Sequence, residues 1–166
     1  PATPQPPPGG GRTRATMLVA DRPGFHEMAM REAPEDVRVR IKPLLDGLVN
    51  IAELHGAWVS QVEGDGFLAL FGVPAARDDD PQRAVAAADR MRRFACSRHD
   101  ELAVHMGVAS GEIFAEMVRG AWSVNGAAVN LASRLCDVAE AGGILVDPLL
   151  CSLIGEAMDA GARGFS

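Results

Sequence analysis

Two short apolar runs joined by a glycine-rich turn constrain the fold of this chain most strongly. The runs cover residues 58–62 and 67–71, and Gly64-Asp65-Gly66 lies between them. Strand-like runs of this length, separated by a few residues that include glycine, are typical of an antiparallel hairpin. The sequence therefore predicts a sheet, with Asp65 at the tip of one of its hairpins.

The region before this hairpin predicts one strand and one helix. An apolar run over residues 16–20 indicates a buried strand that ends at Asp21. After Pro34, apolar residues recur over 37–52 with a period near 3.6, which predicts an amphipathic helix. Gly56 is expected to end this helix, and Pro43 to kink or divide it.

The rest of the chain continues to alternate between the two kinds of pattern. The further expected elements are a helix over 80–96, strands over 102–109 and 112–118, a helix over 127–141, a strand over 144–146 and a helix over 148–158. The resulting order is β-α-β-β-α-β-β-α-β-α. Its first six elements match the ferredoxin-like β-α-β-β-α-β unit, whose helices pack on one face of an antiparallel sheet. The predicted class is therefore α+β, with an antiparallel-rich sheet, helices packed on it, and extra strands and helices beyond the core.

Composition divides the chain into a tail and one domain. Residues 1–14 hold five prolines and three consecutive glycines, which predicts a linker or a disordered tail. Residues 15–166 are expected to form a single domain, truncated at its C-terminal end and linked to regulatory domains elsewhere in a longer protein.

Charge and residue usage exclude several classes of function. The net charge of −6 argues against a nucleic-acid partner, which requires clustered basic residues. The three cysteines form no CxxC pair, which favours a reducing compartment, and we predict a cytoplasmic protein. No apolar run reaches the roughly 20 residues that span a bilayer, so no direct membrane contact is expected. A phosphate-binding P-loop is excluded, because no GxxxxGK segment is present.

Two acidic residues are candidates for metal binding. Asp21 ends the first expected strand and Asp65 lies at the hairpin tip, and in a split β-α-β unit these two segments are neighbours. Two converging carboxylates repel each other unless a cation lies between them, so the pair predicts a divalent ion. Gly24 and Phe25, which follow Asp21, could offer backbone N–H groups to phosphate oxygens. The alternative is that Asp65, between two glycines, only forms a turn.

Asn130 and Arg134 form the other candidate group. They are four residues apart, so they share one face of the expected helix. An amide and a guanidinium side by side can bind a sugar and a phosphate. The alternative is an ordinary solvated helix face.

The segments that carry these residues resemble those of the class III nucleotide cyclases. Residues 20–25 resemble the family's FxDIxGFT segment, and residues 63–72, EGDGFLALFG, resemble its IGDGxMAxFG hairpin. Residues 78–85 look like a HEDDAERAV stretch of bacterial members, and residues 126–135 are similar to GxxVNxAxRL. Residues 142–146 match the strand that follows this motif. The motifs occur in the family's order and cover roughly residues 15–150.

This resemblance implies a homodimer with active sites at the subunit interface. One chain would bind two Mg²⁺ or Mn²⁺ ions through Asp21 and Asp65, with the carbonyl of Arg22 as a further ligand. The partner chain would supply Asn130 to orient the ribose and Arg134 to bind the phosphates of a nucleoside triphosphate. The implied reaction is attack of the 3′-hydroxyl on the α-phosphate, which releases pyrophosphate and leaves a 3′,5′-cyclic nucleotide.

Two departures from the family pattern concern the choice of nucleotide. Gln61 and Ser123 stand at the positions that read the base, where adenylate cyclases carry Lys with Asp or Thr, and guanylate cyclases carry Glu with Cys or Ser. An amide both donates and accepts hydrogen bonds, so Gln61 is expected to discriminate weakly between purines. The leading expectation is synthesis of cyclic AMP from ATP with relaxed selectivity. The alternatives are a guanylate cyclase and a weak or inactive homology domain used for dimerisation or nucleotide sensing.

Overall fold

The computed structural model describes residues 9–98 and 102–163, and for residues 61, 63 and 156–163 it describes the backbone alone. These ranges hold six strands and five helices. In chain order they are β1 (Gly11–Asp21), α1 (Phe25–Arg31), α2 (Pro34–Leu54), β2 (Trp58–Glu63), β3 (Gly66–Phe71), α3 (Asp80–Ser97), β4 (His105–Val118), β5 (Ala121–Asn125), α4 (Ala127–Val138), β6 (Ile144–Val146) and α5 (Pro148–Arg163). The predicted α+β class and antiparallel-rich sheet are confirmed.

One mixed sheet organises the molecule. Its strand order is β2-β3-β1-β4-β5, with every neighbouring pair antiparallel, and β6 pairs in parallel with the first part of β4. The pairing of β1 with β3 sets Ala20 opposite Phe67. The end of the first strand therefore lies beside the β2–β3 hairpin, as the ferredoxin-like topology predicts.

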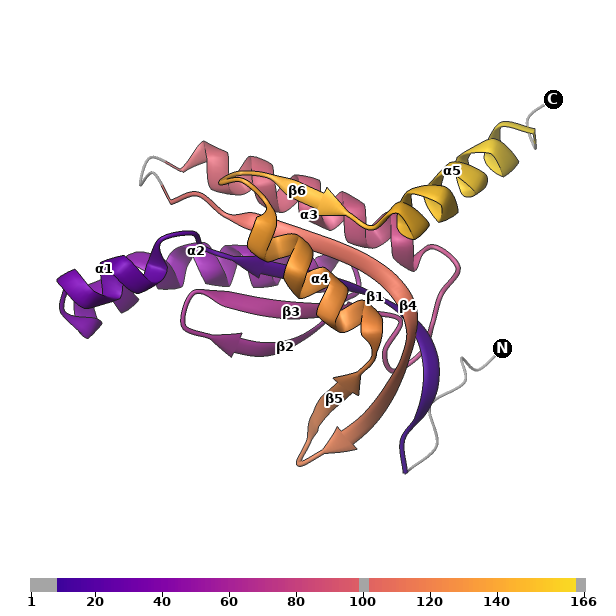
Figure 1. Cartoon of the computed structure of the whole chain (residues 1–166), viewed down its shortest axis with the longest axis horizontal. Helices are drawn as coiled ribbons and strands as arrows, with labels where there is room; N and C mark the ends of the chain where they lie inside the picture. The colour runs from indigo at the N-terminus through magenta and orange to yellow at the C-terminus, as the bar shows by residue number, and fades with distance from the viewer. Residues whose placement is uncertain (1–8, 99–101, 164–166) are drawn as a thin grey trace.

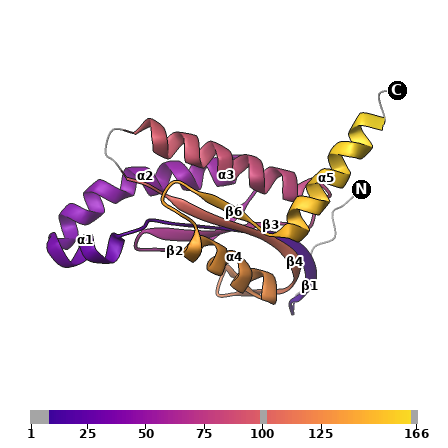
Figure 2. The ribbon, with the colours of Figure 1, turned by 45° about the horizontal axis from the view of Figure 1, so that its top comes forward.

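Helices cover both faces of this sheet. Figures 1 and 2 show α2 and α3 on one face and α4 on the other, with α5 extending away from the body. Side chains of β1 alternate accordingly: Leu18 and Ala20 join the core beneath α2 and α3, whereas Ala15 and Met17 join the one beneath α4. The two helices of the predicted ferredoxin-like unit, α2 and α3, share one face as expected, and α4, which lies beyond that unit, packs on the opposite face.

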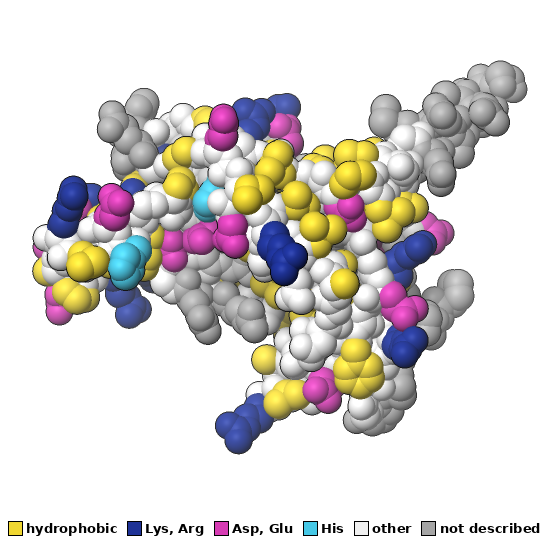
Figure 3. Space-filling model, in the orientation of Figure 1, with side chains coloured by type: hydrophobic (Ala, Val, Ile, Leu, Met, Phe, Trp, Pro, Cys, Tyr) yellow, Lys and Arg dark blue, Asp and Glu magenta, His cyan; other side chains and the backbone are white. Residues whose placement is uncertain are grey.

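Small residues bring α4 close to the sheet. A Cβ atom on Gly107 would collide with the carbonyl oxygen of Ala132, and one on Gly111 would lie 2.9 Å from the Cβ of Ala128. The two glycines of β4 therefore leave room for the backbone of α4. Hydrophobic side chains stay uncovered on this face of the molecule (Figure 3), including Leu131 and Val138 of α4 itself.

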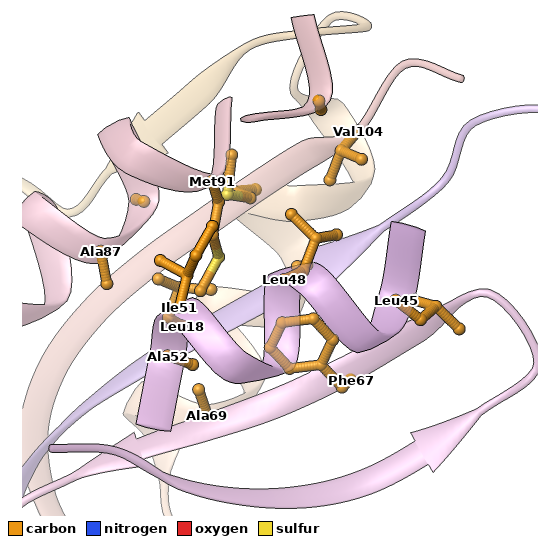
Figure 4. Close-up of a cluster of buried hydrophobic side chains, with 14 of the residues drawn as sticks. Leu18, Leu45, Leu48, Ile51, Ala52, Phe67, Ala69, Ala87, Met91 and Val104 are labelled. Atoms are coloured by element: carbon orange, nitrogen blue, oxygen red, sulfur yellow. The ribbon is translucent and has the colours of Figure 1, made fainter. Parts of the chain in front are cut away.

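Larger side chains fill the opposite face. Leu48 and Ile51 of α2 point toward Met91 of α3 and Leu18 of β1 (Figure 4), and all four are buried. Each such side chain contributes roughly 1.5–3 kcal/mol by leaving water. Most of the apolar core therefore lies between the sheet and the pair α2 and α3.

Several element boundaries correct the sequence-based expectations. β1 begins at Gly11, so residues 11–14, expected in a linker, pair with β4 instead, whereas residues 1–8 lie outside the described residues. The two strands expected over 102–109 and 112–118 are one continuous strand, because Gly111 serves helix packing and not a turn. α1 and β5 were not expected, and α2 is not divided at Pro43.

No helix within the described ranges is both long enough and apolar enough to cross a membrane.

Candidate active site

The two predicted metal-binding acids lie together at one end of the sheet. Asp21 is the last residue of β1, and Asp65 occupies the turn between β2 and β3. Their side chains are within hydrogen-bonding reach of each other, although 44 residues (65 − 21) separate them in the sequence. Pairing of β1 with β3 produces this contact, and the prediction that the two carboxylates converge is therefore met by the structure.

The shared environment changes the acidity of Asp65. Burial, together with the hydrogen bond and the charge repulsion from Asp21, raises the pKa of Asp65 to about 7. The backbone N–H groups of Asp65 and Arg22 act against this shift. Near neutral pH, one proton or one cation is therefore needed to keep the two carboxylates together.

Gly66 keeps the hairpin close to β1. A Cβ atom on this residue would lie 2.8 Å from the carbonyl oxygen of Ala20 and 3.0 Å from Oδ1 of Asp21. Both separations are shorter than ordinary carbon–oxygen contacts, so a larger residue would move the hairpin away from β1. The second glycine of Gly64-Asp65-Gly66 thus serves the contact between the acids as well as the turn.

The segment after Asp21 adds polar groups to the same end of the sheet. The backbone N–H of Arg22 donates to Oδ1 of Asp21 at 2.7 Å, while Nε and Nη1 of the Arg22 side chain are buried without a hydrogen-bond partner among the described residues. A buried cationic group without a partner is costly, which favours an anionic ligand nearby. Gly24 adopts a left-handed conformation (φ 78°) before α1, and Phe25 begins that helix, whose first N–H groups have no intrahelical acceptor.

A cleft of about 240 Å³ lies against the two acids. We call it the acid cleft; besides Asp21 and Asp65 its lining residues are Val19, Ala20, Gly66, Phe67, Leu68, Val129 and Ser133. Val129 and Ser133 come from α4, and the Ser133 hydroxyl donates to the carbonyl of Val129 at 3.2 Å. Val129 and Ser133 were not predicted as site residues, although they have the same four-residue spacing as Asn130 and Arg134, one position earlier on the helix.

Asn130 and Arg134 do not line the acid cleft of their own chain. Both are exposed on α4, one position further along the helix than Val129 and Ser133. Neither forms a hydrogen bond or an ion pair with a described residue. The structure therefore brings the two acids together and leaves the Asn130–Arg134 pair available to another molecule.

The two predicted base-reading residues lie on strands at opposite edges of the sheet. Gln61 is on β2, where its side chain is outside the described set, and Ser123 is half-buried on β5. The hydroxyl of Ser60 donates to the carbonyl of Trp122 at 3.5 Å. Because these residues are next in sequence to Gln61 and Ser123, this hydrogen bond shows that the two edge strands approach each other.

The donor set suits a hard divalent cation. Within the described residues, no group of three or more His, Cys, Asp or Glu side chains is arranged to hold a metal ion. The two carboxylates of Asp21 and Asp65 instead offer oxygen donors, which Mg²⁺ accepts while retaining water and phosphate ligands. The two carboxylates therefore fit a divalent cation whose other ligands are water or phosphate oxygens.

Comparison with known proteins identifies the family. Residues 11–160 match the family described as the adenylate and guanylate cyclase catalytic domain. The chain belongs to this family, and the sequence-based resemblance to class III cyclases is confirmed.

Individual relatives include both kinds of cyclase. An adenylate cyclase of Mycobacterium bovis is 32% identical over 139 residues, which cover 80% of this chain and 31% of the relative. The guanylyl cyclase Cya2 has a similar structure, with a TM-score of 0.81, 26% identity, and coverage of 87% of this chain and 80% of that one. The adenylyl cyclase CyaB from P. aeruginosa has a TM-score of 0.78 at 26% identity, over 89% and 83% of the two chains. The chain thus spans about a third of the length of the curated relative.

Proposed function

We propose that this domain converts ATP to 3′,5′-cyclic AMP and pyrophosphate at two equivalent sites of a homodimer. The contact between Asp21 and Asp65 is the observation that carries the proposal. The pair offers two carboxylates to the cations that the family resemblance implies for phosphoryl transfer, which supports the proposal.

Each candidate site residue has a defined role in the proposed reaction. Asp21, Asp65 and the carbonyl of Arg22 hold two Mg²⁺ or Mn²⁺ ions. When bound, these ions lower the pKa of the substrate 3′-hydroxyl and neutralise charge that develops on the phosphates. Asn130 orients the ribose, and Arg134 donates hydrogen bonds to the phosphate oxygens. Backbone N–H groups of Gly24 and Phe25 assist in holding the phosphate chain.

A site shared between two chains is supported by the geometry of α4. Asn130 and Arg134 lie outside the acid cleft of their own chain and have no hydrogen-bond or ion-pair partner among the residues that the structure describes. A second copy can present the same pair to the acids of the first, and two-fold symmetry then generates two equivalent sites. Hydrophobic residues exposed on this face, such as Leu131, support such an interface.

Base selectivity is the least constrained part of the proposal. Gln61 and Ser123 match neither the adenine-reading nor the guanine-reading pattern, so GTP is the alternative substrate. We expect Gln61→Lys to raise the ratio of ATP to GTP turnover about tenfold, measured as the ratio of kcat/KM values. An unchanged ratio would remove Gln61 from the base site.

The decisive experiment identifies the product directly. Protein incubated with ATP or GTP and Mn²⁺ is expected to release the cyclic nucleotide and pyrophosphate, detected by mass. Asp65→Ala should reduce turnover at least a hundredfold, whereas Asp36→Ala, an exposed acid in the first turn of α2, should leave it unchanged. Retained turnover in Asp65→Ala would contradict the metal assignment. Nucleotide binding without product would instead favour the inactive homology domain.

The proposal includes a cellular setting that follows from family membership and composition. We place the domain in the cytoplasm, where ATP is available, as one part of a longer protein with regulatory domains. The curated relative is about three times as long as the matched region, which supports this arrangement.

A further inference from the structure

A second cleft, larger than the acid cleft, lies on the other side of the β2–β3 hairpin. Its volume is about 460 Å³, within the range of small-molecule sites. We call it the α2 cleft; it is bounded by α1, by α2 and by the hairpin. Its apolar lining consists of Phe25, Ile41, Leu45 and Val62. Of this lining, the proposed cyclase reaction uses the backbone N–H of Phe25 alone.

The charged residues of the α2 cleft come from one ridge of α2. Arg38, Lys42 and Asp46 follow each other at four-residue intervals and therefore lie along the same helix face. Nζ of Lys42 pairs with Oδ2 of Asp46 at 2.5 Å, so these two charges largely cancel. Arg38 has no hydrogen bond or ion pair with any described residue. Among the side chains that the structure describes, the guanidinium of Arg38 is thus the one charged group of this cleft without a partner.

We propose that the α2 cleft binds a small aromatic carboxylate that regulates the domain. The guanidinium of Arg38 can take a carboxylate through two parallel hydrogen bonds. The aromatic body of the ligand would pack against Phe25 and against the aliphatic side chains of Ile41, Leu45 and Val62. This ligand class meets both features of the cleft, its apolar lining and the positive charge of Arg38, which has no partner among the described residues.

The α2 cleft shares structural elements with the acid cleft. Phe25 belongs to α1, which begins four residues after Asp21, and Gly64 directly precedes Asp65. The two residues are neighbours that line the same cleft, and a Cβ atom added to Gly64 would lie 3.3 Å from Cε1 of Phe25. A ligand pressed against Phe25 therefore acts on both segments that carry the acids. This coupling rests on the proposed function, whereas binding itself does not.

Naphthoate is a suitable probe because it is fluorescent, aromatic and carries one carboxylate. We expect saturable binding to the whole chain in equilibrium titrations followed by its fluorescence. Naphthylmethylammonium, which has the same ring system and the opposite charge, should bind at least tenfold more weakly. Absence of saturable binding, or equal affinity for the two compounds, would overturn the proposal.

Three variants test the location of the probe. Arg38→Glu should weaken naphthoate binding at least tenfold by reversing the charge at the cleft edge. Arg90→Glu is the matched control, because Arg90 is an exposed arginine on α3 outside the cleft lining, and it should leave the affinity unchanged. Val62→Asp should also abolish binding, because it puts a negative charge into the apolar lining of the cleft. Val62 is 54% exposed, so its replacement should leave the core intact. Equal affinities in Arg38→Glu and Arg90→Glu would overturn the assignment to this cleft.

A separate titration tests the coupling. Mn²⁺ binding, measured by electron paramagnetic resonance without nucleotide, should change at least threefold when naphthoate is present, and the effect should vanish in Arg38→Glu. By linkage, Mn²⁺ must change naphthoate affinity by the same factor. Naphthoate binding with unchanged Mn²⁺ affinity would overturn the coupling. Failure of Mn²⁺ to bind at all would instead contradict the proposed function.

Discussion

The two faces of the sheet are packed in different ways. Beneath α2 and α3, large side chains such as Leu48 and Met91 fill the space, whereas α4 approaches β4 across glycine and alanine. Large apolar side chains contribute stability in proportion to the area that they bury. Close backbone packing buries less side-chain area but fixes the position of α4, which carries Asn130 and Arg134. We infer that the first face mainly stabilises the domain and the second mainly positions the site.

The largest effect on stability is expected on the α2–α3 face. Leu48→Ala removes a side chain that is 1% exposed, and the lost burial and the new cavity should lower the free energy of unfolding by about 3–4 kcal/mol. Urea unfolding measures this change. Mn²⁺ affinity of the folded variant should remain as in the wild type, because Leu48 does not line the acid cleft. A loss of metal affinity would break the division between the two faces.

The α4 face is tested by adding one methyl group. Gly107→Ala would place a Cβ atom against the backbone of α4 at Ala132 and Cys136, and should lower the free energy of unfolding by about 2–3 kcal/mol. Because α4 must shift to accommodate it, turnover by the folded variant should fall at least tenfold.

Gly155→Ala is the matched control for this substitution. Gly155 lies in α5, and a Cβ atom on it would have no neighbour within 4 Å. Alanine there should raise stability by up to about 1 kcal/mol, because glycine is unfavourable inside a helix. Turnover by Gly107→Ala equal to that of the control would show that the position of α4 does not matter.

The smallest effect concerns the charge of Asp65. Its pKa is raised to about 7 in the fold, so between about pH 4 and pH 7 the folded state holds more protons than the unfolded state. The free energy of unfolding therefore falls as the pH rises through this window. Asp65→Asn removes this penalty and should stabilise the metal-free protein at pH 8 by about 1 kcal/mol, allowing for solvent screening, and by less at pH 5.

Urea unfolding in EDTA at both pH values measures this difference, with Asp36→Asn as the control for the loss of an exposed carboxylate. A gain in stability that is the same at pH 5 and pH 8 would contradict the raised pKa.

Local patterns in the sequence predicted those features that depend on neighbouring residues. The hairpin around Asp65 and the helix from Pro34 both form as expected. The proximity of Asp21 to that hairpin was predicted from the expected strand order, and not from any local pattern. The expected break between strands 102–109 and 112–118 was wrong because the role of Gly111 depends on Ala128, which is distant in the sequence. β5 was missed because its five residues follow a turn at Arg119 and Gly120 and offer little pattern of their own.

The candidate site shows the same limit. Helical spacing predicted that Asn130 and Arg134 share a face, but only the packing of α4 shows that this face lies outside their own acid cleft. Val129 and Ser133 reach that cleft because Ala128 and Ala132 are buried against the sheet and fix the rotation of the helix.

Mixing two inactive variants tests the shared site most directly. Asp21→Ala removes a metal ligand and Arg134→Ala removes a phosphate-binding group, so each homodimer alone should be inactive. In an equal mixture, half of the dimers are expected to be heterodimers with one intact site each, and activity should return to about a quarter of the wild-type value. Failure to recover any activity, with heterodimers shown to form, would contradict a site built from two chains.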